Sequence, residues 1–246
     1  MTEATKPFPM NAGAPRRPFY SGRLAGWGVV VLLALIGSQL FGLLESPPDR
    51  DMGNLQKIMY VHVPAAWSAF IAFFVVFGYS IAYLWTGKSK HDLVAASAAE
   101  VGALMTALTL ALGSIWGRPT WGVWWTWDPR LTSTAVLLVV FVGYLALRSF
   151  TDDYDRRARW SAIVGILGFL NVPVVYLSVR WWRSIHQVQS SPATVDTTFA
   201  WGLRLNAIAF LLLTIYFIRE RYRAAAMEQR LEQAIEEREL RGGTRV

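Results

Sequence analysis

Six apolar runs constrain the fold of this 246-residue chain more than any other feature. Each run holds about 20 mostly apolar residues, the length that a helix needs to cross the hydrocarbon core of a bilayer. A helix satisfies its backbone hydrogen bonds internally, so it can cross a region that contains no water. The runs lie at approximately residues 25–44, 65–86, 93–115, 131–148, 160–179 and 199–218. They predict an all-α integral membrane protein that folds as a bundle of six transmembrane helices.

The composition agrees with this prediction. Hydrophobic residues make up 54% of the chain and charged residues 17%, against about 25% charged residues in a typical soluble protein. The chain contains no cysteine, which excludes disulfides, thiolate metal sites and covalent haem attachment through a Cys-x-x-Cys-His motif. The sequence also lacks a P-loop, so we expect no ATPase activity in this chain.

The distribution of basic residues predicts the orientation in the membrane. Of the Lys and Arg residues, 17 lie in the tails 1–24 and 219–246 and in the short connections 87–92 and 148–159, and six lie in the other three connections. The positive-inside rule then places both termini in the cytoplasm. The net charge of +7 therefore indicates topology rather than a nucleic-acid partner. The connections that we expect to face outward are 45–64, 116–130 and 180–198.

These counts divide the chain into a cytoplasmic N-terminal tail, 1–24, a six-helix membrane domain, 25–218, and a charged C-terminal tail, 219–246. The C-terminal tail is rich in Arg, Glu, Gln and Ala, and its apolar residues recur at helical spacing. It is expected to continue the sixth helix as an exposed amphipathic extension, or to dock on a partner.

A tryptophan-rich segment follows the third apolar run and reads WGRPTWGVWWTWD over residues 116–128. Tryptophan is common at membrane interfaces, because its ring is apolar and carries one N–H donor. Five tryptophans in thirteen residues exceed what an anchor requires, so a platform for a large flat apolar ligand is the second interpretation. The five are Trp116, Trp121, Trp124, Trp125 and Trp127.

Two of the three histidines are expected on the outer face, at the depth of the tryptophans. His62 lies where the chain enters the second apolar run, and His186 lies just beyond the fifth. Neutral imidazole is a common axial ligand of haem iron, and two imidazoles can bind it from opposite faces. A zinc site is the weaker alternative, because it needs a third protein ligand such as Asp128 or Asp196. His91 lies in a basic inner turn and is expected to have no functional role.

Charged residues near this face could bind the anionic propionates of a haem, because arginine pairs with carboxylates through two parallel hydrogen bonds. Contact with phospholipid headgroups is the alternative role for at least two of these arginines. The candidates are Arg118, Arg130, Arg180 and Arg183. Asp128 precedes Pro129 and equally fits the N-cap of the fourth helix.

Two ionisable residues, Glu100 and Arg204, fall inside the expected spans. Intramembrane charges are costly and are usually paired or functional. At about 1.5 Å per residue, their depths differ enough to make a direct salt bridge doubtful.

The sequence resembles the CcmC family of haem-handling membrane proteins, which act in cytochrome c maturation. The resemblance is carried by WGRPTWGVWWTWDPRLTS, which is similar to the family's tryptophan-rich signature, and by the two histidine segments HVPAAW and WWRSIHQ. It covers about residues 20–218. The larger families CcmF and CcsA share the signature, but their chains are longer.

The resemblance implies a function that the residue patterns alone do not establish. It implies that His62 and His186 ligate the iron of haem b, bound non-covalently and transiently. It implies that the tryptophan-rich loop holds the porphyrin on the periplasmic face of the bacterial inner membrane, and that Asp128 faces the histidines or the acceptor. The haem would then pass to the chaperone CcmE, in a complex with the ABC-type subunits CcmA and CcmB and the small protein CcmD. Any ATP hydrolysis would belong to CcmA.

Three alternatives stay open at this point. The first is a haem lyase of the same signature family, the second is a transporter that moves haem across the bilayer, and the third is a scaffold whose tryptophans serve only as anchors. The first expectation is that the chain binds and delivers haem and is not an enzyme.

Overall fold

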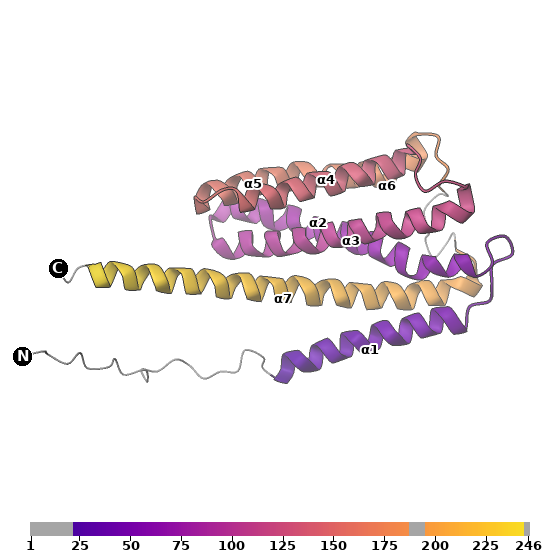
Figure 1. Cartoon of the computed structure of the whole chain (residues 1–246), viewed down its shortest axis with the longest axis horizontal. Helices are drawn as coiled ribbons and strands as arrows, with labels where there is room; N and C mark the ends of the chain where they lie inside the picture. The colour runs from indigo at the N-terminus through magenta and orange to yellow at the C-terminus, as the bar shows by residue number, and fades with distance from the viewer. Residues whose placement is uncertain (1–21, 187–194, 244–246) are drawn as a thin grey trace, which may run out of the picture.

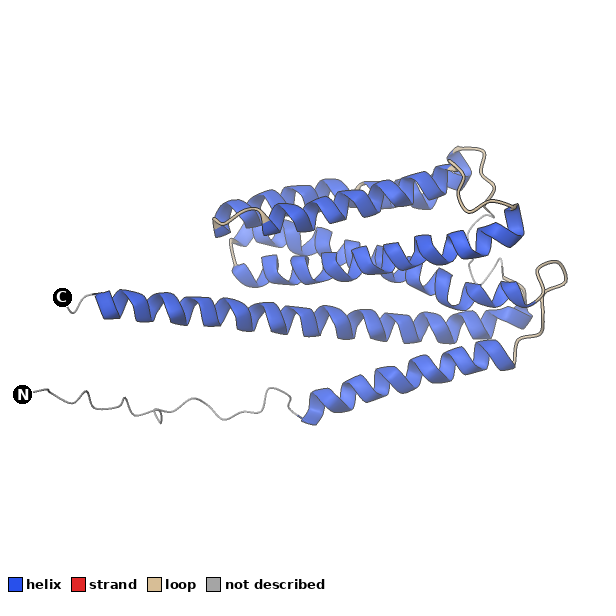
Figure 2. Ribbon diagram, in the orientation of Figure 1, coloured by secondary structure: helices blue, strands red, loops and turns tan. Residues whose placement is uncertain are grey.

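The computed structural model describes residues 22–186 and 195–243, and within them it contains helices and no strand (Figures 1 and 2). Residues 1–21, residues 187–194 of the connection between α6 and α7, and the last three residues lie outside this description. The helices are α1 (Gly22–Leu44), the 3-10 helix η1 (Asn54–Ile58), α2 (Met59–Thr86), α3 (Ser89–Trp121), α4 (Pro129–Ser149), α5 (Tyr154–Phe169), α6 (Asn171–Trp181) and α7 (Thr197–Gly243).

Six helical stretches are long and apolar enough to cross a membrane, as predicted. Each contains an 18-residue window with a mean hydropathy of at least 1.7. Spans that are successive along the chain run in opposite directions, and α1 begins and α7 ends towards the same end of the bundle (Figure 1). The six-helix fold is therefore confirmed, and the side of the membrane on which each end lies stays a prediction.

Helix α3 ends later than predicted, at Trp121 instead of residue 115. Gly122 has a φ of 79°, which only glycine adopts readily, and its N–H bonds to the carbonyl of Arg118 at 3.0 Å. The Arg118 guanidinium donates to the carbonyl of Gly122. The first six residues of the tryptophan-rich segment are therefore helical, and the connection to α4 begins at Gly122.

Helix α2 begins earlier than predicted, at Met59 instead of residue 65, so His62 lies within the helix. Pro64 lies inside α2 and lacks the N–H that would bond to the carbonyl of Tyr60. Gln39 of α1 donates to this carbonyl at 3.4 Å. A neighbouring helix thus partners the group that the proline leaves unbonded.

The fifth span is broken into α5 and α6 at Leu170, which the apolar pattern did not indicate. Pro173 causes the break, since it offers no N–H to the carbonyl of Phe169 and its ring crowds that carbonyl. The side chain of Asn171 donates to the carbonyl of Ser133 in α4 at 2.8 Å. Beyond the break α6 packs on α4, whereas before the break α5 packs on both α4 and α2.

Small residues allow α2 and α3 to pack closely in the centre of the bundle. A Cβ atom on Gly102 would lie 2.5 Å from the ring of Phe73, which also stacks on Phe141 with ring centroids 3.8 Å apart. Close approach through small residues is the common way in which membrane helices pack. At the opposite end from the tryptophans, Asp92 of α3 and Arg148 of α4 form a two-bond ion pair with distances of 2.5 and 2.9 Å.

Helix α7 is continuous from Thr197 to Gly243, which confirms that the charged tail extends the sixth span as a helix (Figure 1). Glu100 of α3 pairs with Arg221 of α7 through two hydrogen bonds. The doubt about a bridge between Glu100 and Arg204 is thus borne out, since Arg204 lies over the ring of Trp201, 5.2 Å from its centroid.

Candidate functional site

A cavity of about 300 Å³ lies between α2, α3, α4 and α6, near the end of the bundle that carries the tryptophans. Both His62 and His186 line it, which brings together two residues that are far apart in the sequence. A second cavity of about 240 Å³ shares His62, His186, Gly113 and Trp116 with the first. The two histidines therefore stand where the two cavities meet.

His186 is held in place by Asp128. The Nδ1 atom of His186 lies 3.0 Å from Oδ1 of Asp128. Oδ2 of the same carboxylate accepts hydrogen bonds from the Ser184 hydroxyl at 2.7 Å and from the Ile185 amide at 2.9 Å. A histidine that donates one ring N–H to a carboxylate keeps its other nitrogen, here Nε2, available for a metal.

Asp128 also caps α4, because its Oδ1 accepts a hydrogen bond from the amide of Arg130 at 2.9 Å. The sequence indicated this cap, and the structure adds the bond to His186 at the same side chain. Burial raises the pKa of Asp128, but the bonds from Ser184 and Ile185, with the nearby His186, outweigh burial and hold it below its usual 3.8. The carboxylate thus stays charged and fixes the segment after α6 against the start of α4.

Burial also keeps His186 neutral. It lowers the pKa of His186 below its usual 6.5, although the charge of Asp128 offsets part of this shift. Neutral imidazole is the form that binds a metal, so the surroundings of this side chain favour its ligating state.

His62 points from α2 towards α3. Its Nδ1 atom is buried and has no hydrogen-bond partner among the described residues. A Cβ atom on Gly113 would lie 3.1 Å from Cε1 of His62, so a larger residue there would crowd the ring. Trp116 contacts His62 edge-on, with ring centroids 5.8 Å apart. An unpaired buried nitrogen costs free energy unless a ligand satisfies it, which fits a site for a metal-centred ligand.

The start of α2, which carries His62, is anchored by Tyr60 on the opposite face of the helix. Tyr60 is fully buried, and its hydroxyl lies 2.6 Å from the hydroxyl of Ser46. Cβ atoms on Gly42 of α1 and Gly202 of α7 would each lie 2.8 Å from the ring of Tyr60. The two glycines therefore form a slot for this ring between α1 and α7.

A pair of amide side chains, Gln39 and the buried Asn206, joins the same three helices. Gln39 of α1 donates to Oδ1 of Asn206 at 2.6 Å, in addition to its bond with the carbonyl of Tyr60. Asn206 is fully buried, and its Nδ2 donates to the carbonyl oxygens of Ser38 and Gly202. Bonds of this kind fix the position of a helix, because breaking them would leave polar groups unpaired in a buried setting.

The five tryptophans do not form one platform. Trp116 and Trp121 line the second cavity, and Trp121 lies edge-on to His186 with ring centroids 4.8 Å apart. Trp124 and Trp127 are 60% and 82% exposed and line neither cavity. Trp125 is partly buried and contacts Trp127 edge-on. Two of the tryptophans thus line the cavities beside the histidines, and two are exposed.

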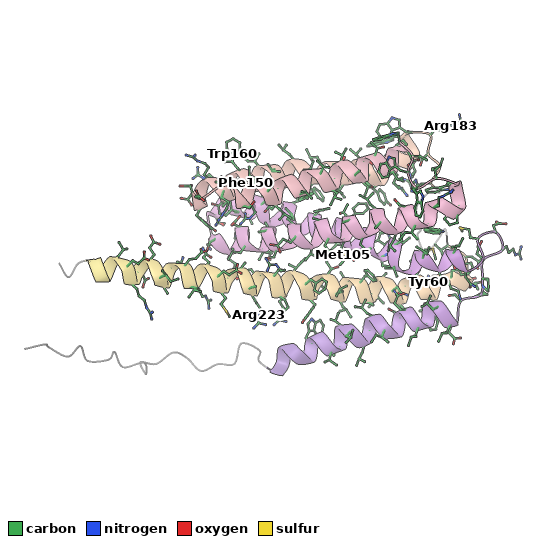
Figure 3. The ribbon with its side chains drawn as sticks, viewed as in Figure 1. Tyr60, Met105, Phe150, Trp160, Arg183 and Arg223 are labelled. Atoms are coloured by element: carbon green, nitrogen blue, oxygen red, sulfur yellow. The ribbon has the colours of Figure 1, made fainter. Side chains whose placement is uncertain are left out.

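Of the candidate arginines, Arg130 is the one that lines either cavity, and it donates to the carbonyl of Tyr176 at 3.4 Å. Arg118 is exposed and bonds to Gly122 instead. Arg180 lies in the last turn of α6. Arg183 is exposed at the same end of the molecule and lines neither cavity (Figure 3).

The zinc alternative finds no support in the described part of the chain, where no three His, Cys, Asp or Glu side chains gather into a metal site. Asp128 bonds to His186 rather than completing such a set, and Asp196 accepts a hydrogen bond from the Thr198 amide. His91 bonds to the hydroxyl of Thr86 in the turn between α2 and α3.

Sequence reasoning missed the residues that support the histidines. Gly113, Ser184 and Tyr60 act through contacts with other helices, and each is an ordinary residue for its segment. Ser184 lies two residues before His186, but nothing in that spacing indicates the carboxylate that both contact.

The chain matches the family model described as "Heme exporter protein C" (CcmC) over residues 12–237. It belongs to this family. The match extends beyond the 20–218 range of the sequence resemblance and includes most of the C-terminal helical extension.

Individual relatives cover most of the chain. Heme exporter protein C of Bradyrhizobium diazoefficiens is 37% identical over 202 residues, which cover 79% of this chain and 76% of the relative. The Escherichia coli protein of the same name is 36% identical over 217 residues, covering 85% and 88%. A Marchantia polymorpha protein described as a putative cytochrome c biosynthesis ccmC-like mitochondrial protein is 34% identical over 179 residues, covering 71% and 76%.

Proposed function

We propose that this protein binds haem between His62 and His186 and delivers it to an acceptor protein for cytochrome c biogenesis. The observation that carries the proposal is the placement of both imidazoles on one cavity, with His186 oriented by Asp128 and His62 unpaired at Nδ1. The family membership supports haem as the cargo, since the relatives carry the name heme exporter protein C.

Each residue has a distinct role in this proposal. The histidines bind the iron from two sides, and Asp128 keeps His186 in the tautomer that presents Nε2. Trp116 and Trp121 cover the porphyrin at the cavity walls, because flat aromatic faces exclude water from a flat apolar ligand. Arg130 pairs with a propionate, because it is the candidate arginine that lines the cavity.

Delivery would follow when an acceptor replaces one axial ligand. We assign the acceptor role to the chaperone CcmE, and the complex to CcmA, CcmB and CcmD, by analogy with the family. The exposed Trp124 and Trp127 lie beside the site and suit an aromatic contact with such a partner. On this proposal the haem site faces the periplasm, the chain performs no chemistry on haem, and any ATP hydrolysis belongs to a partner.

The lyase and transporter alternatives differ in what they require. A lyase would transfer haem covalently to an apocytochrome without an acceptor chaperone. A transporter would need a polar path through the bundle, whereas the lining of the described cavity includes the apolar side chains of Leu137 and Phe70.

An absorption spectrum tests the proposal. The purified wild-type protein loaded with haem should show the Soret and α/β bands of six-coordinate low-spin haem. His62→Ala or His186→Ala should convert these bands to a high-spin form, and the double variant should lose them. His91→Ala is the matched control and should behave as the wild type. A Soret spectrum that both substitutions leave unchanged would contradict the proposed site.

A further inference from the structure

Four helices line the first cavity, and the lines along which adjacent lining helices meet are here called seams. Only three of the four seams are closed by packing of one helix on the next. The lining of the cavity comes from α2, α3, α4 and α6. In the described residues α2 packs on α3, α3 packs on α4 and α4 packs on α6, while α2 and α6 make no comparable contact. The fourth seam, between α2 and α6, is therefore the one that the described residues do not close by helix packing.

The break at Leu170 explains why this seam is open. Before the break α5 packs on α2, and after it α6 follows α4 instead. Figure 1 shows α2 beside α5 at one end of the bundle and running away from α6 towards the other end. Pro173, which causes the break, thus separates the two helices at the level of the histidines.

Below His62, the cavity lining on α2 and α6 is uncharged and mostly apolar. It includes Ala66, Trp67 and Phe70 on α2, and Val175 and Tyr176 on α6. Tyr176 is 47% exposed although it lines the cavity, so the cavity reaches the molecular surface at this side chain. From His62 to Phe70 the lining follows α2 for eight residues, about 12 Å along the helix axis. The opening therefore extends into the depth of the hydrocarbon core.

The cavity wall is apolar below the histidines. The hydroxyls of Thr106, Thr109 and Thr134 line it, but each donates to a carbonyl of its own helix at 2.7–2.8 Å. Arg130, at the start of α4, is the charged side chain of the lining. Such a space suits a flat apolar molecule with an anionic end directed at Arg130.

We propose that the cavity opens sideways into the bilayer between α2 and α6, and that haem dissolved in the membrane enters through this seam. This inference rests on the proposed haem site. The porphyrin slides between α2 and α6 with its propionates towards Arg130, and the iron then meets the two histidines. Entry from the bilayer requires no polar path across the membrane, and the bundle would load haem without carrying it between the two aqueous sides.

Spin labels can test the opening without any haem, because the natural chain contains no cysteine. Single labels are placed at Ala66→Cys and Tyr176→Cys in the full-length protein in phospholipid nanodiscs. Val139→Cys, on an exposed face of α4, is the lipid reference, and Asp51→Cys, in an exposed loop, is the water reference. We expect both seam labels to be relaxed by oxygen as strongly as Val139→Cys, and hardly at all by a water-soluble nickel complex. Relaxation by nickel, or protection from both reagents, would overturn the proposal.

Loading kinetics test the route itself. Haemin is dissolved in the nanodisc bilayer, and the appearance of the low-spin Soret band is followed. Ala66→Trp, which fills the seam, should slow loading by about tenfold or more, equivalent to a barrier higher by about 1.4 kcal/mol. Val139→Trp is the matched control and should load at the wild-type rate.

The outcomes separate the two proposals. A wild-type protein that never shows the low-spin band contradicts the haem site. A wild-type protein that loads, together with Ala66→Trp that loads equally fast, contradicts only the lateral route. If Ala66→Trp fails to load at all, the accessibility of the two spin labels decides.

Discussion

At the scale of single residues, Asp128 joins two tasks that the sequence presented as alternatives. Its Oδ1 caps α4 through the amide of Arg130, and both of its oxygens bond to the segment Ser184–His186. A carboxylate has about four lone-pair positions, so one side chain can serve all four donors. The helix cap fixes the carboxylate, and the carboxylate fixes the imidazole.

Replacing Asp128 by Asn should therefore weaken haem binding by about 10- to 100-fold, as is typical when the partner of a ligating histidine is lost. Asparagine still caps a helix, so α4 should persist. Asp153→Asn is the matched control, because Asp153 caps α5 in the same way, through the Arg156 amide, and is not a site residue. Haem titration followed at the Soret band measures both. Equal affinities in the two variants would show that Asp128 does not orient His186.

The pKa of His186 predicts how binding depends on acidity. Its folded-state pKa lies below 6.5, so the unfolded chain takes up this proton at higher pH than the folded chain does. The contribution of neutral His186 is therefore complete above pH 6.5 and is lost as the pH falls through the lowered value. We expect the low-spin spectrum to survive at pH 6.5 and to disappear only in more acidic buffer. A midpoint above pH 6.5 would contradict this prediction.

At the scale of elements, the site depends on where α2 begins relative to α1 and α7. Tyr60, between Gly42 and Gly202, sets the position of the turn that presents His62. Helix α1 packs mainly on α7, so this junction is its principal link to the site. A peripheral helix thereby contributes to the geometry of a ligand that it does not touch.

Gly202→Ala tests this junction. The new Cβ atom would meet the ring of Tyr60 at 2.8 Å, and overpacking of this kind costs about 1–3 kcal/mol. We expect a lower thermal midpoint in nanodiscs and a partial shift of the haem spectrum to high spin, because His62 moves with Tyr60.

Gly143→Ala is the matched control for this substitution. Gly143 also lies in a helix, but a Cβ atom there meets nothing within 4 Å. Its thermal midpoint should stay unchanged or rise, since alanine favours a helix over glycine by about 1 kcal/mol. A similar loss of stability in both variants would mean that the slot for Tyr60 is not what Gly202 provides.

At the scale of the whole molecule, two ion pairs hold the helices at the end away from the histidines. Asp92 and Arg148 join α3 to α4, and Glu100 and Arg221 join α3 to α7. Arg221 belongs to the segment that the sequence assigned to the charged tail. The C-terminal extension is thus attached to the membrane domain at its base.

The basic residues predict the orientation of the whole bundle, which can be measured by cysteine labelling. Asp51→Cys, in the loop between α1 and η1, and Lys90→Cys, at the start of α3, lie at opposite ends of the bundle. In cells with a permeabilised outer membrane, an impermeant maleimide should label Asp51→Cys and leave Lys90→Cys unmodified until the inner membrane is broken. The reverse pattern would place the histidine site on the cytoplasmic side and contradict the positive-inside prediction.

The sequence alone determined that the chain is a six-helix membrane protein, because hydrophobic length is a local property that six separate runs each satisfy. It also singled out His62, His186 and the tryptophan-rich segment, since unusual residue types stand out against an apolar background. It misplaced the start of α2 and the end of α3, where helices continue past the apolar runs. The apolar pattern also missed the break at Leu170, although Pro173, which produces it, stands in the sequence.

Only the tertiary structure decided how these residues act together. The contacts of His186 with Asp128, of His62 with Gly113, and of Tyr60 with two glycines join different helices, and no local pattern encodes them. The same holds for the seam between α2 and α6, which depends on which neighbour each half of a broken helix packs against. Contacts between distant segments depend on how the helices pack, whereas each helix forms from its own sequence and the membrane around it.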